Sequence, residues 1–100
     1  MLSFRRTVED FLGFDWDEPN REAHFQKHGI DFPIAARIDW FDVLKARDRR
    51  VSGPPRWVAL AYCPILERVV VVVYVKSHRI GRILSIRLAN GEEAGLFHAR

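Results

Sequence analysis

Residues 68–88 read RVVVVVYVKSHRIGRILSIRL, two apolar runs separated by a short polar segment. The first run is almost entirely valine, a β-branched residue that favours strands. An unbroken run of this kind is typical of a central strand that is buried on both faces. Residues 76–79 are then predicted to form a basic hairpin turn, and residues 81–88 the next strand. The stretch predicts an antiparallel hairpin at the middle of a sheet.

The flanking segments extend this hairpin into a complete domain. In chain order they contain an edge strand, two helices, a strand, a loop, a strand and a final helix, predicted at residues 14–16, 18–28, 32–39, 40–47, 47–56, 57–63 and 91–100. The expected fold class is α+β. Two N-terminal helices should pack on a twisted antiparallel sheet of about four strands that is followed by a short C-terminal helix.

The size and composition of the chain fit a single domain. Its 100 residues are 48% hydrophobic and 29% charged, a globular balance. Residues 1–13 are expected to be an N-terminal extension that forms a loose turn or helix, and residues 14–100 the domain itself. The only cysteine is Cys63, which excludes a disulfide framework and favours a reducing, cytoplasmic location. No apolar run reaches the roughly 18–20 residues of a membrane span, so no membrane contact is expected.

Charge divides the chain into an acidic and a basic half. Residues 8–43 hold nine acids and three bases, whereas residues 44–87 hold ten bases and two acids. Most of the bases are arginines, whose forked guanidinium group suits phosphate. A basic sheet would attract nucleic acid or an acidic partner. The alternative is that the two halves neutralise each other across their interface.

The predicted helix at residues 18–28 ends in two side chains that can handle protons and phosphates. Asp17 is a plausible N-cap and Gly29 a natural C-terminal stop, so Lys27 and His28 fall in the last turn. There they can contact substrate or transfer a proton, or simply complement the helix dipole. His24 and His28 have the spacing of zinc-binding histidines, but no third ligand lies nearby and no metal is expected.

Arginines within and between the strands are the second group of candidates. They are Arg56, Arg82 and Arg87 in or beside strands and Arg47, Arg49 and Arg50 in the loop. An arginine within a strand crosses a sheet face, and phosphate binding would explain its presence there. In a regular strand Arg82 and Arg87 point to opposite faces, so one site can hold both only if a bulge intervenes.

Several of these segments together resemble a known family. Residues 14–32 read FDWDEPNREAHFQKHGIDF, which resembles the opening signature of the BrnT-type toxins, approximately F-x-W-D-…-K-H-G-V/I-x-F. Later matches follow in order: arginines flanking the glycine loop, the valine strand, RILSIRLA at residues 82–89, and Glu93 with Phe97. The resemblance covers about residues 14–97. The chain departs from the usual pattern at Asn20, His24, Pro54-Pro55, Lys76 and Phe97.

The resemblance implies a fold, an activity and partners. Such toxins have the RelE/ParE-like fold and are metal-independent ribonucleases that use no cofactor. They are neutralised by a ribbon-helix-helix antitoxin of the BrnA type, and the complex binds operator DNA. The ribose 2′-hydroxyl would attack the adjacent phosphate. By motif position Arg56 and Arg87 would stabilise the phosphate, and Lys27 and His28 would contact substrate or transfer protons. RNA binding would fall to Arg47, Arg49, Arg50, Lys76, Arg79 and Arg82.

Two other functions remain open at this stage. The chain could be a binding module with weak or no catalysis that acts mainly in complexes with antitoxin and operator. Fold analogy alone suggests a third possibility, inhibition of DNA gyrase in the manner of ParE toxins.

Overall fold

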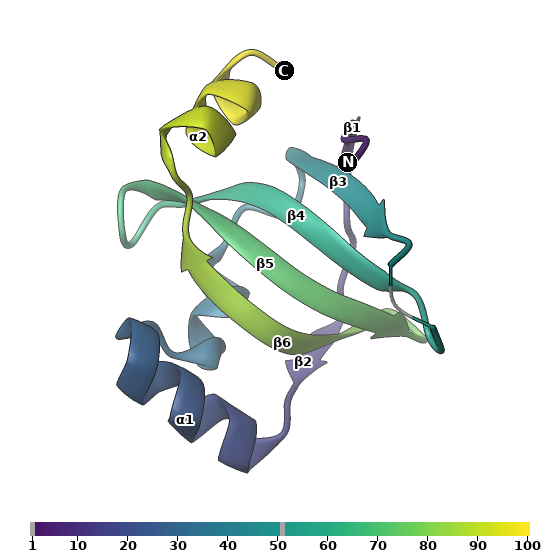
Figure 1. Cartoon of the computed structure of the whole chain (residues 1–100), viewed down its shortest axis with the longest axis vertical. Coiled ribbons are helices and arrows are strands. Elements are labelled where there is room, and N and C mark those ends of the chain that lie inside the picture. Colours follow the sequence, from purple (N-terminus) through teal and green to yellow (C-terminus); the bar gives the residue numbers. More distant parts are fainter. Residues whose placement is uncertain (1, 51) are drawn as a thin grey trace.

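The computed structural model describes residues 2–50 and 52–100, and within them the chain forms one six-stranded sheet with helices on its faces and edge (Figure 1). The elements are β1 (Arg5–Thr7), β2 (Gly13–Asp15), α1 (Glu18–His28), η1 (Phe32–Arg37), β3 (Val43–Asp48), β4 (Arg56–Cys63), β5 (Arg68–Ser77), β6 (Ile80–Leu88) and α2 (Gly91–His98). The strand order is β1-β3-β4-β5-β6-β2. Met1 of the predicted extension and Val51 of the predicted loop lie outside the described residues.

The central hairpin is confirmed. β5 pairs antiparallel with both β4 and β6, and its valines are buried on both faces. The turn is shorter than the predicted four residues, because β5 runs to Ser77 and β6 begins at Ile80. The two residues between them, His78 and Arg79, have φ values of 52° and 66°. A two-residue turn with positive φ at both positions matches the twist of the strands it joins.

The sheet and the N-terminal region differ from the prediction in three respects. The sheet has six strands rather than four, and it is mixed, because β2 runs parallel to β6. Residues 1–13 were expected to form a loose turn or helix, but they contain β1, which pairs antiparallel with β3. Strands of three residues are too short to show a periodicity in the sequence. Their pairing depends on contacts with distant parts of the chain.

The expectation of two N-terminal helices is also wrong. α1 has the predicted bounds, but the second predicted helix, residues 32–39, is replaced by the six-residue 3-10 helix η1, which ends at Arg37. Its backbone bonds join residues three apart, from the Ile34 N–H to the Asp31 carbonyl at 3.1 Å and from the Ile38 N–H to the Ala35 carbonyl at 3.3 Å. A short segment of this tighter helix closes the core without needing a second full helix.

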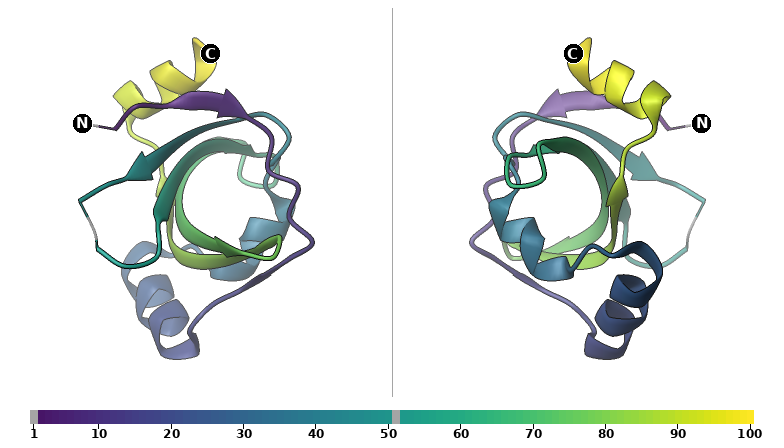
Figure 2. Two further views of the ribbon diagram at one scale, coloured as in Figure 1. Left: turned by 90° about the vertical axis from the view of Figure 1, so that its right-hand side faces the viewer. Right: turned by 90° about the vertical axis from the view of Figure 1, so that its left-hand side faces the viewer.

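Two cores lie on the two faces of the curved sheet (Figure 2). The strands curl around the inner core, and η1 closes its open side. The inner core contains Phe32, Trp40 and Tyr74, with Phe11 and Phe14 packed against it. The outer core lies under α2 and includes leucines and valines of β3, β4 and β5. The N-terminal segment, residues 2–16, contributes to both cores, because Leu2 and Phe4 pack against the outer one.

α1 is attached to the edge of β6 through polar groups. No residue of α1 is buried. β2 pairs with β6 only as far as Arg82. Farther along β6, Asn20 donates its side-chain N–H to the Leu84 carbonyl at 3.2 Å. His24 Nε2 lies 2.6 Å from the Ile86 carbonyl oxygen and 3.2 Å from the Ile86 backbone nitrogen, so either tautomer of the ring can bond to the backbone of Ile86. These two departures from the family pattern therefore cover an open sheet edge.

A β-bulge places Arg82 and Arg87 on the same face. The pairing of β5 with β6 shifts register between Val73 and Tyr74, so β6 has one extra residue there. Ile83 and Ile86 consequently both face the inner core although they are three residues apart. The residues that precede and follow them, Arg82 and Arg87, face outward. The bulge therefore meets the condition set by the sequence, because in a regular strand the two arginines would point to opposite faces.

Candidate nucleic-acid interface

A buried carboxylate holds two of the lysines in the basic half. Glu9 is 3% exposed, and its oxygens lie 2.8 Å from Lys45 Nζ and 2.7 Å from Lys76 Nζ. The Tyr74 hydroxyl donates a further hydrogen bond to it at 2.5 Å. Burial opposes ionisation of Glu9, but these hydrogen bonds outweigh burial and lower its pKa below the usual value. Burial and the same carboxylate raise the pKa of Tyr74.

The cations around the β5–β6 turn are all paired with acids of the N-terminal segment. Lys76 has the buried partner just described, Arg79 pairs with Asp10 at 3.1 Å, and Arg82 pairs with Asp15 at 3.4 Å. These three side chains were predicted to bind RNA. Along this edge the acidic and basic parts of the chain neutralise each other, the second of the two possibilities that the charge pattern left open.

Arg87 joins β6 to the start of α2. Its guanidinium group forms a two-pronged ion pair with Glu93, at 2.8 and 2.7 Å, and donates to the Leu88 carbonyl at 3.3 Å. Glu93 also accepts from the backbone N–H of Asn90 in the capping box of α2. Hydrogen bonds from Arg87 lower the pKa of Glu93. Three of the five donors of the guanidinium group are occupied, which leaves two for another acceptor.

The end of α1 brings a neutral histidine into the same region. Lys27 and His28 are both exposed in the last turn of α1, and the rings of His24 and His28 are 4.4 Å apart. Desolvation lowers the pKa of His28, as do the charges of His24, Lys27 and Arg87. His28 is therefore mostly unprotonated at neutral pH, and three of the four predicted catalytic residues lie close enough to interact electrostatically.

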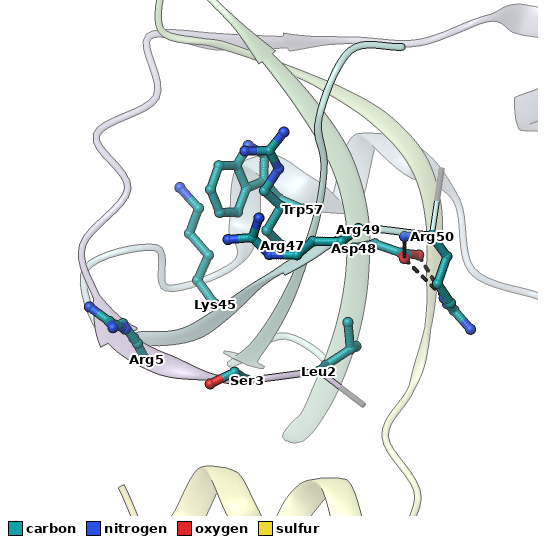
Figure 3. A pocket seen from close by; sticks show the side chains of 9 residues that line it. All are labelled: Leu2, Ser3, Arg5, Lys45, Arg47, Asp48, Arg49, Arg50 and Trp57. Atoms are coloured by element: carbon teal, nitrogen blue, oxygen red, sulfur yellow. Dashed lines mark hydrogen bonds and ion pairs between the residues drawn. The ribbon is translucent and has the colours of Figure 1, made fainter. Parts of the chain in front are cut away.

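A basic pocket of about 690 Å³ opens where the N-terminal segment separates from β3 (Figure 3). Leu2, Ser3 and Arg5 form one wall; the other is lined by Lys45, Arg47, Asp48, Arg49, Arg50 and Trp57. Asp48 accepts from Arg50 at 2.9 Å, a hydrogen bond that lowers the pKa of this carboxyl to about 2. Arg47, Arg49 and Arg50 thus gather here, although Arg47, which was predicted in the loop, lies in β3.

Arg56, the fourth predicted catalytic residue, lies elsewhere on the sheet. It begins β4 opposite Asp48 and is exposed. Arg87 lies opposite Val71 on β5, whereas the residue after Arg56 pairs with Tyr74. The two arginines are therefore at least three strand residues apart along β5, roughly 10 Å. The strand register separates them.

Some residues of this surface were not found from the sequence. Arg5 lay in the predicted extension, and Lys45 and Trp57 carried no motif. Glu9 looked like one more acid in an acidic half. Two signals were available in retrospect: Lys45 alternates with the apolar residues of its strand, and Glu9 lies between Val8 and Phe11. Phe97, where the family pattern has tyrosine, is 3% exposed in the outer core.

Two findings bear on metals and membranes. In residues 2–50 and 52–100, no group of three or more His, Cys, Asp or Glu side chains has the geometry to hold a metal ion. Among the helices formed by these residues, none combines the length and the apolar character that crossing a membrane requires.

A curved mixed sheet with cations gathered at two places defines a small α+β protein with a strongly basic surface. Residues 16–93 match the family model described as the ribonuclease toxin BrnT of type II toxin–antitoxin systems, so the chain belongs to that family. The crystal structure of the Brucella abortus ribonuclease toxin BrnT is similar at 20% sequence identity with a TM-score of 0.52. The alignment covers 78% of this chain and 96% of that chain, and it shows a shared fold. No curated protein matches the sequence.

Proposed function

We propose that this chain is a metal-independent endoribonuclease, the toxin of a type II toxin–antitoxin module. The observation that carries the proposal is that α1, which ends in the exposed Lys27 and His28, is hydrogen-bonded through His24 to Ile86, the residue before Arg87. The group combines a histidine that is neutral at neutral pH, a lysine, and an arginine with two donors unoccupied. Family membership supplies the ribonuclease class.

Each of these three side chains has a role in cleavage by the ribose 2′-hydroxyl. His28, unprotonated at neutral pH, accepts the proton of the hydroxyl as it attacks the adjacent phosphate. The two unoccupied donors of Arg87 stabilise the charge that develops on the phosphate oxygens. Lys27 holds the neighbouring part of the RNA as a point charge. His28 takes up the proton of the hydroxyl and then gives a proton to the departing 5′ oxygen.

The remaining arginines bind the RNA strand. Arg56 and Arg82 share the outer face of the sheet. Arg47 of β3 and the loop arginines Arg49 and Arg50 lie around the basic pocket. Their spread over the sheet is suited to a backbone that runs across several strands. Charge lost at these positions should weaken binding, whereas changes at His28 or Arg87 should lower the cleavage rate.

The proposal includes the partners and the location that the family implies. An antitoxin of the ribbon-helix-helix type neutralises the toxin, and the complex binds operator DNA through the antitoxin. Both act in the cytoplasm. The support for these statements is membership of a type II toxin–antitoxin family.

The direct test is cleavage of RNA by the purified chain freed from any antitoxin. The protein should cleave RNA equally well with and without EDTA, and it should leave supercoiling by DNA gyrase unaffected. An RNA pool that stays intact in both conditions would sink the proposal. Dependence of cleavage on added metal would refute its metal-independent chemistry.

A binding module without catalysis is the second candidate, and the two-pronged pairing of Arg87 with Glu93 favours it. That pairing leaves Arg87 fewer donors for a phosphate than an unpaired arginine offers. Expression of the chain alone separates the two candidates. The toxin arrests growth, whereas the binding module forms a tight complex with its antitoxin and leaves growth unchanged.

A further inference from the structure

We propose that the basic pocket between the N-terminal segment and β3 binds the phosphate backbone of single-stranded RNA, with Arg5 completing the site. The choice of RNA rests on the proposed function; the pocket itself rests on the charges and contacts described below. The N-terminal segment is thereby part of the binding surface.

Three of the five cations that line the pocket have no ion-pair partner in the described chain. Of the sixteen lysines and arginines, nine form ion pairs within the described residues. Three of the other seven, Arg5, Arg47 and Arg49, line this one pocket. The carboxylate in its wall, Asp48, already accepts hydrogen bonds from Arg50. A ligand that entered would therefore meet an uncompensated positive field.

The two walls are held by separate elements. β1 pairs with β3 from Thr7 to Arg5, opposite Lys45, and the chain before Arg5 then diverges from β3. Figure 3 shows Leu2, Ser3 and Arg5 along one side of the opening, across from Lys45 and Arg47. A phosphate between these walls can accept from guanidinium groups on both sides.

The aromatic side chain in the pocket favours a single strand. Trp57 lines the wall next to Arg47, with the Lys45 ammonium 4.0 Å from its ring centroid. A basic groove with an aromatic side chain is the usual arrangement in proteins that bind single-stranded nucleic acid, because unpaired bases can pack against the ring. In a duplex the bases are stacked inside, so the ring would find no base to contact.

The N-terminal wall is an addition to the family domain. The family match begins at residue 16, and Leu2, Ser3 and Arg5 precede it. The segment is nevertheless fixed in place, because β1 joins the sheet and Glu9 is buried between two lysines. Arg5 is thus held over the pocket rather than carried on a loose tail.

Two neighbouring arginines offer a matched pair of variants. Arg5 lines the pocket and has no ion-pair partner in the described chain, whereas Arg6 pairs with Asp42 at 3.0 Å and does not line it. Arg5→Gln and Arg6→Gln change the net charge equally, so long-range attraction to RNA falls by the same amount in both. Arg49→Gln and Arg68→Gln form a second pair, since Arg68 is exposed and lies outside the pocket.

The experiment measures binding of a short labelled 2′-O-methyl RNA, which cannot be cleaved through its 2′ oxygen, by fluorescence anisotropy at several salt concentrations. Arg5→Gln and Arg49→Gln should weaken binding about three- to tenfold and reduce the salt slope by about 0.7 each. Arg6→Gln and Arg68→Gln should stay within about twofold of the unchanged chain. Thermal melting of all four variants checks that folding is retained.

Equal losses within each pair would overturn the proposal, because they would mean that only net charge matters. Tighter binding of duplex DNA than of RNA, lost in Arg5→Gln, would assign the pocket to DNA and also overturn it. Cleavage of natural RNA is measured in parallel. If cleavage occurs and the Arg5–Arg6 difference is absent, the pocket assignment fails alone; if the difference is present without cleavage, the proposed function fails alone.

Discussion

The two basic regions of the sheet differ in whether their charges are compensated. Around the β5–β6 turn, Lys76, Arg79 and Arg82 each have a carboxylate from the N-terminal segment within 3.4 Å. In the pocket beside β3, Arg5 and Arg47 have no such partner in the described chain. In the first region the cations therefore tie the N-terminal segment to the sheet whatever else they bind, whereas in the second Arg5 and Arg47 are available to a ligand. A count of positive charges does not distinguish them.

The largest effect on stability is expected from removing Glu9, the buried carboxylate of the compensated region. Glu9→Ala leaves Lys45 and Lys76 without their carboxylate and the buried Tyr74 hydroxyl without its acceptor. The loss of unfolding free energy should be about 3–5 kcal/mol, measured by urea denaturation. Asp10→Ala, which removes an exposed partner of Arg79, should change it by less than about 0.5 kcal/mol. Equal losses in the two variants would show that burial of Glu9 is unimportant.

The pH dependence of stability in the unchanged chain and in Glu9→Ala provides a second test of the role of Glu9. The pKa of Glu9 is lowered in the folded chain, so its contribution is complete above the unfolded value near 4.5. It is lost as the pH falls through the folded pKa. The difference in stability between the unchanged chain and Glu9→Ala should therefore be constant near neutral pH and shrink in acid.

Arg87 is intermediate between the two regions, because it is paired and still has two donors unoccupied. Arg87→Ala should lower the rate constant for RNA cleavage about 10²- to 10³-fold through loss of charge stabilisation. Glu93→Gln removes the charge of its partner but keeps an acceptor for it. That control should retain cleavage within a few-fold, as measured in single-turnover assays. Matching losses in the two variants would assign Arg87 a structural role only.

The attachment of α1 offers a smaller and more local effect. His24→Ala removes the side chain that bonds to the backbone of Ile86 at the edge of β6 and should cost about 1–2 kcal/mol in urea denaturation. Cleavage should also fall, because Lys27 and His28 are carried on the same helix. Gln26→Ala, at an exposed position of α1, is the control and should change neither quantity. A stable, fully active His24→Ala variant would contradict the account of α1.

The smallest effect should come from removing the ion-pair partner of Arg50, which leaves that arginine without a carboxylate. Asp48→Asn removes the charge that holds Arg50 and makes the pocket more positive. RNA should then bind about two- to threefold more tightly, with a steeper salt dependence, in the anisotropy assay. Glu67→Gln makes the same change in net charge outside the pocket and should have less effect. Weaker binding by Asp48→Asn would argue that Asp48 itself contacts the ligand.

The parts of the fold that could be predicted are those encoded locally. The valine run of β5 and the caps of α1 at Asp17 and Gly29 specify their elements within a few residues. β1 was missed, whereas β2 was expected one residue later, as an edge strand at residues 14–16. The pairing of these three-residue strands depends on their partners β3 and β6. The 3-10 form of η1 likewise follows from how the segment closes the inner core.

The sequence singled out the candidate residues by type and motif, and their roles stay a prediction. Lys27 and His28 end the helix that His24 attaches to Ile86, next to Arg87. Arg56 was grouped with them, but the register of β4 on β5 places it at least three strand residues from Arg87. Register and pairing of charges depend on contacts between distant segments. For the same reason Glu9 could not be recognised as a buried partner of two lysines.

Attack by the ribose 2′-hydroxyl is best tested by cleavage, in EDTA, of an RNA with a single 2′-deoxy nucleotide at a mapped cleavage site. We expect the unmodified RNA to be cut there to leave a 2′,3′-cyclic phosphate, and the 2′-deoxy substitution to abolish cutting at that site alone. Continued cutting of the substituted RNA, with a 5′-phosphate on the product, would contradict attack by the 2′-hydroxyl and with it the roles given to His28 and Arg87.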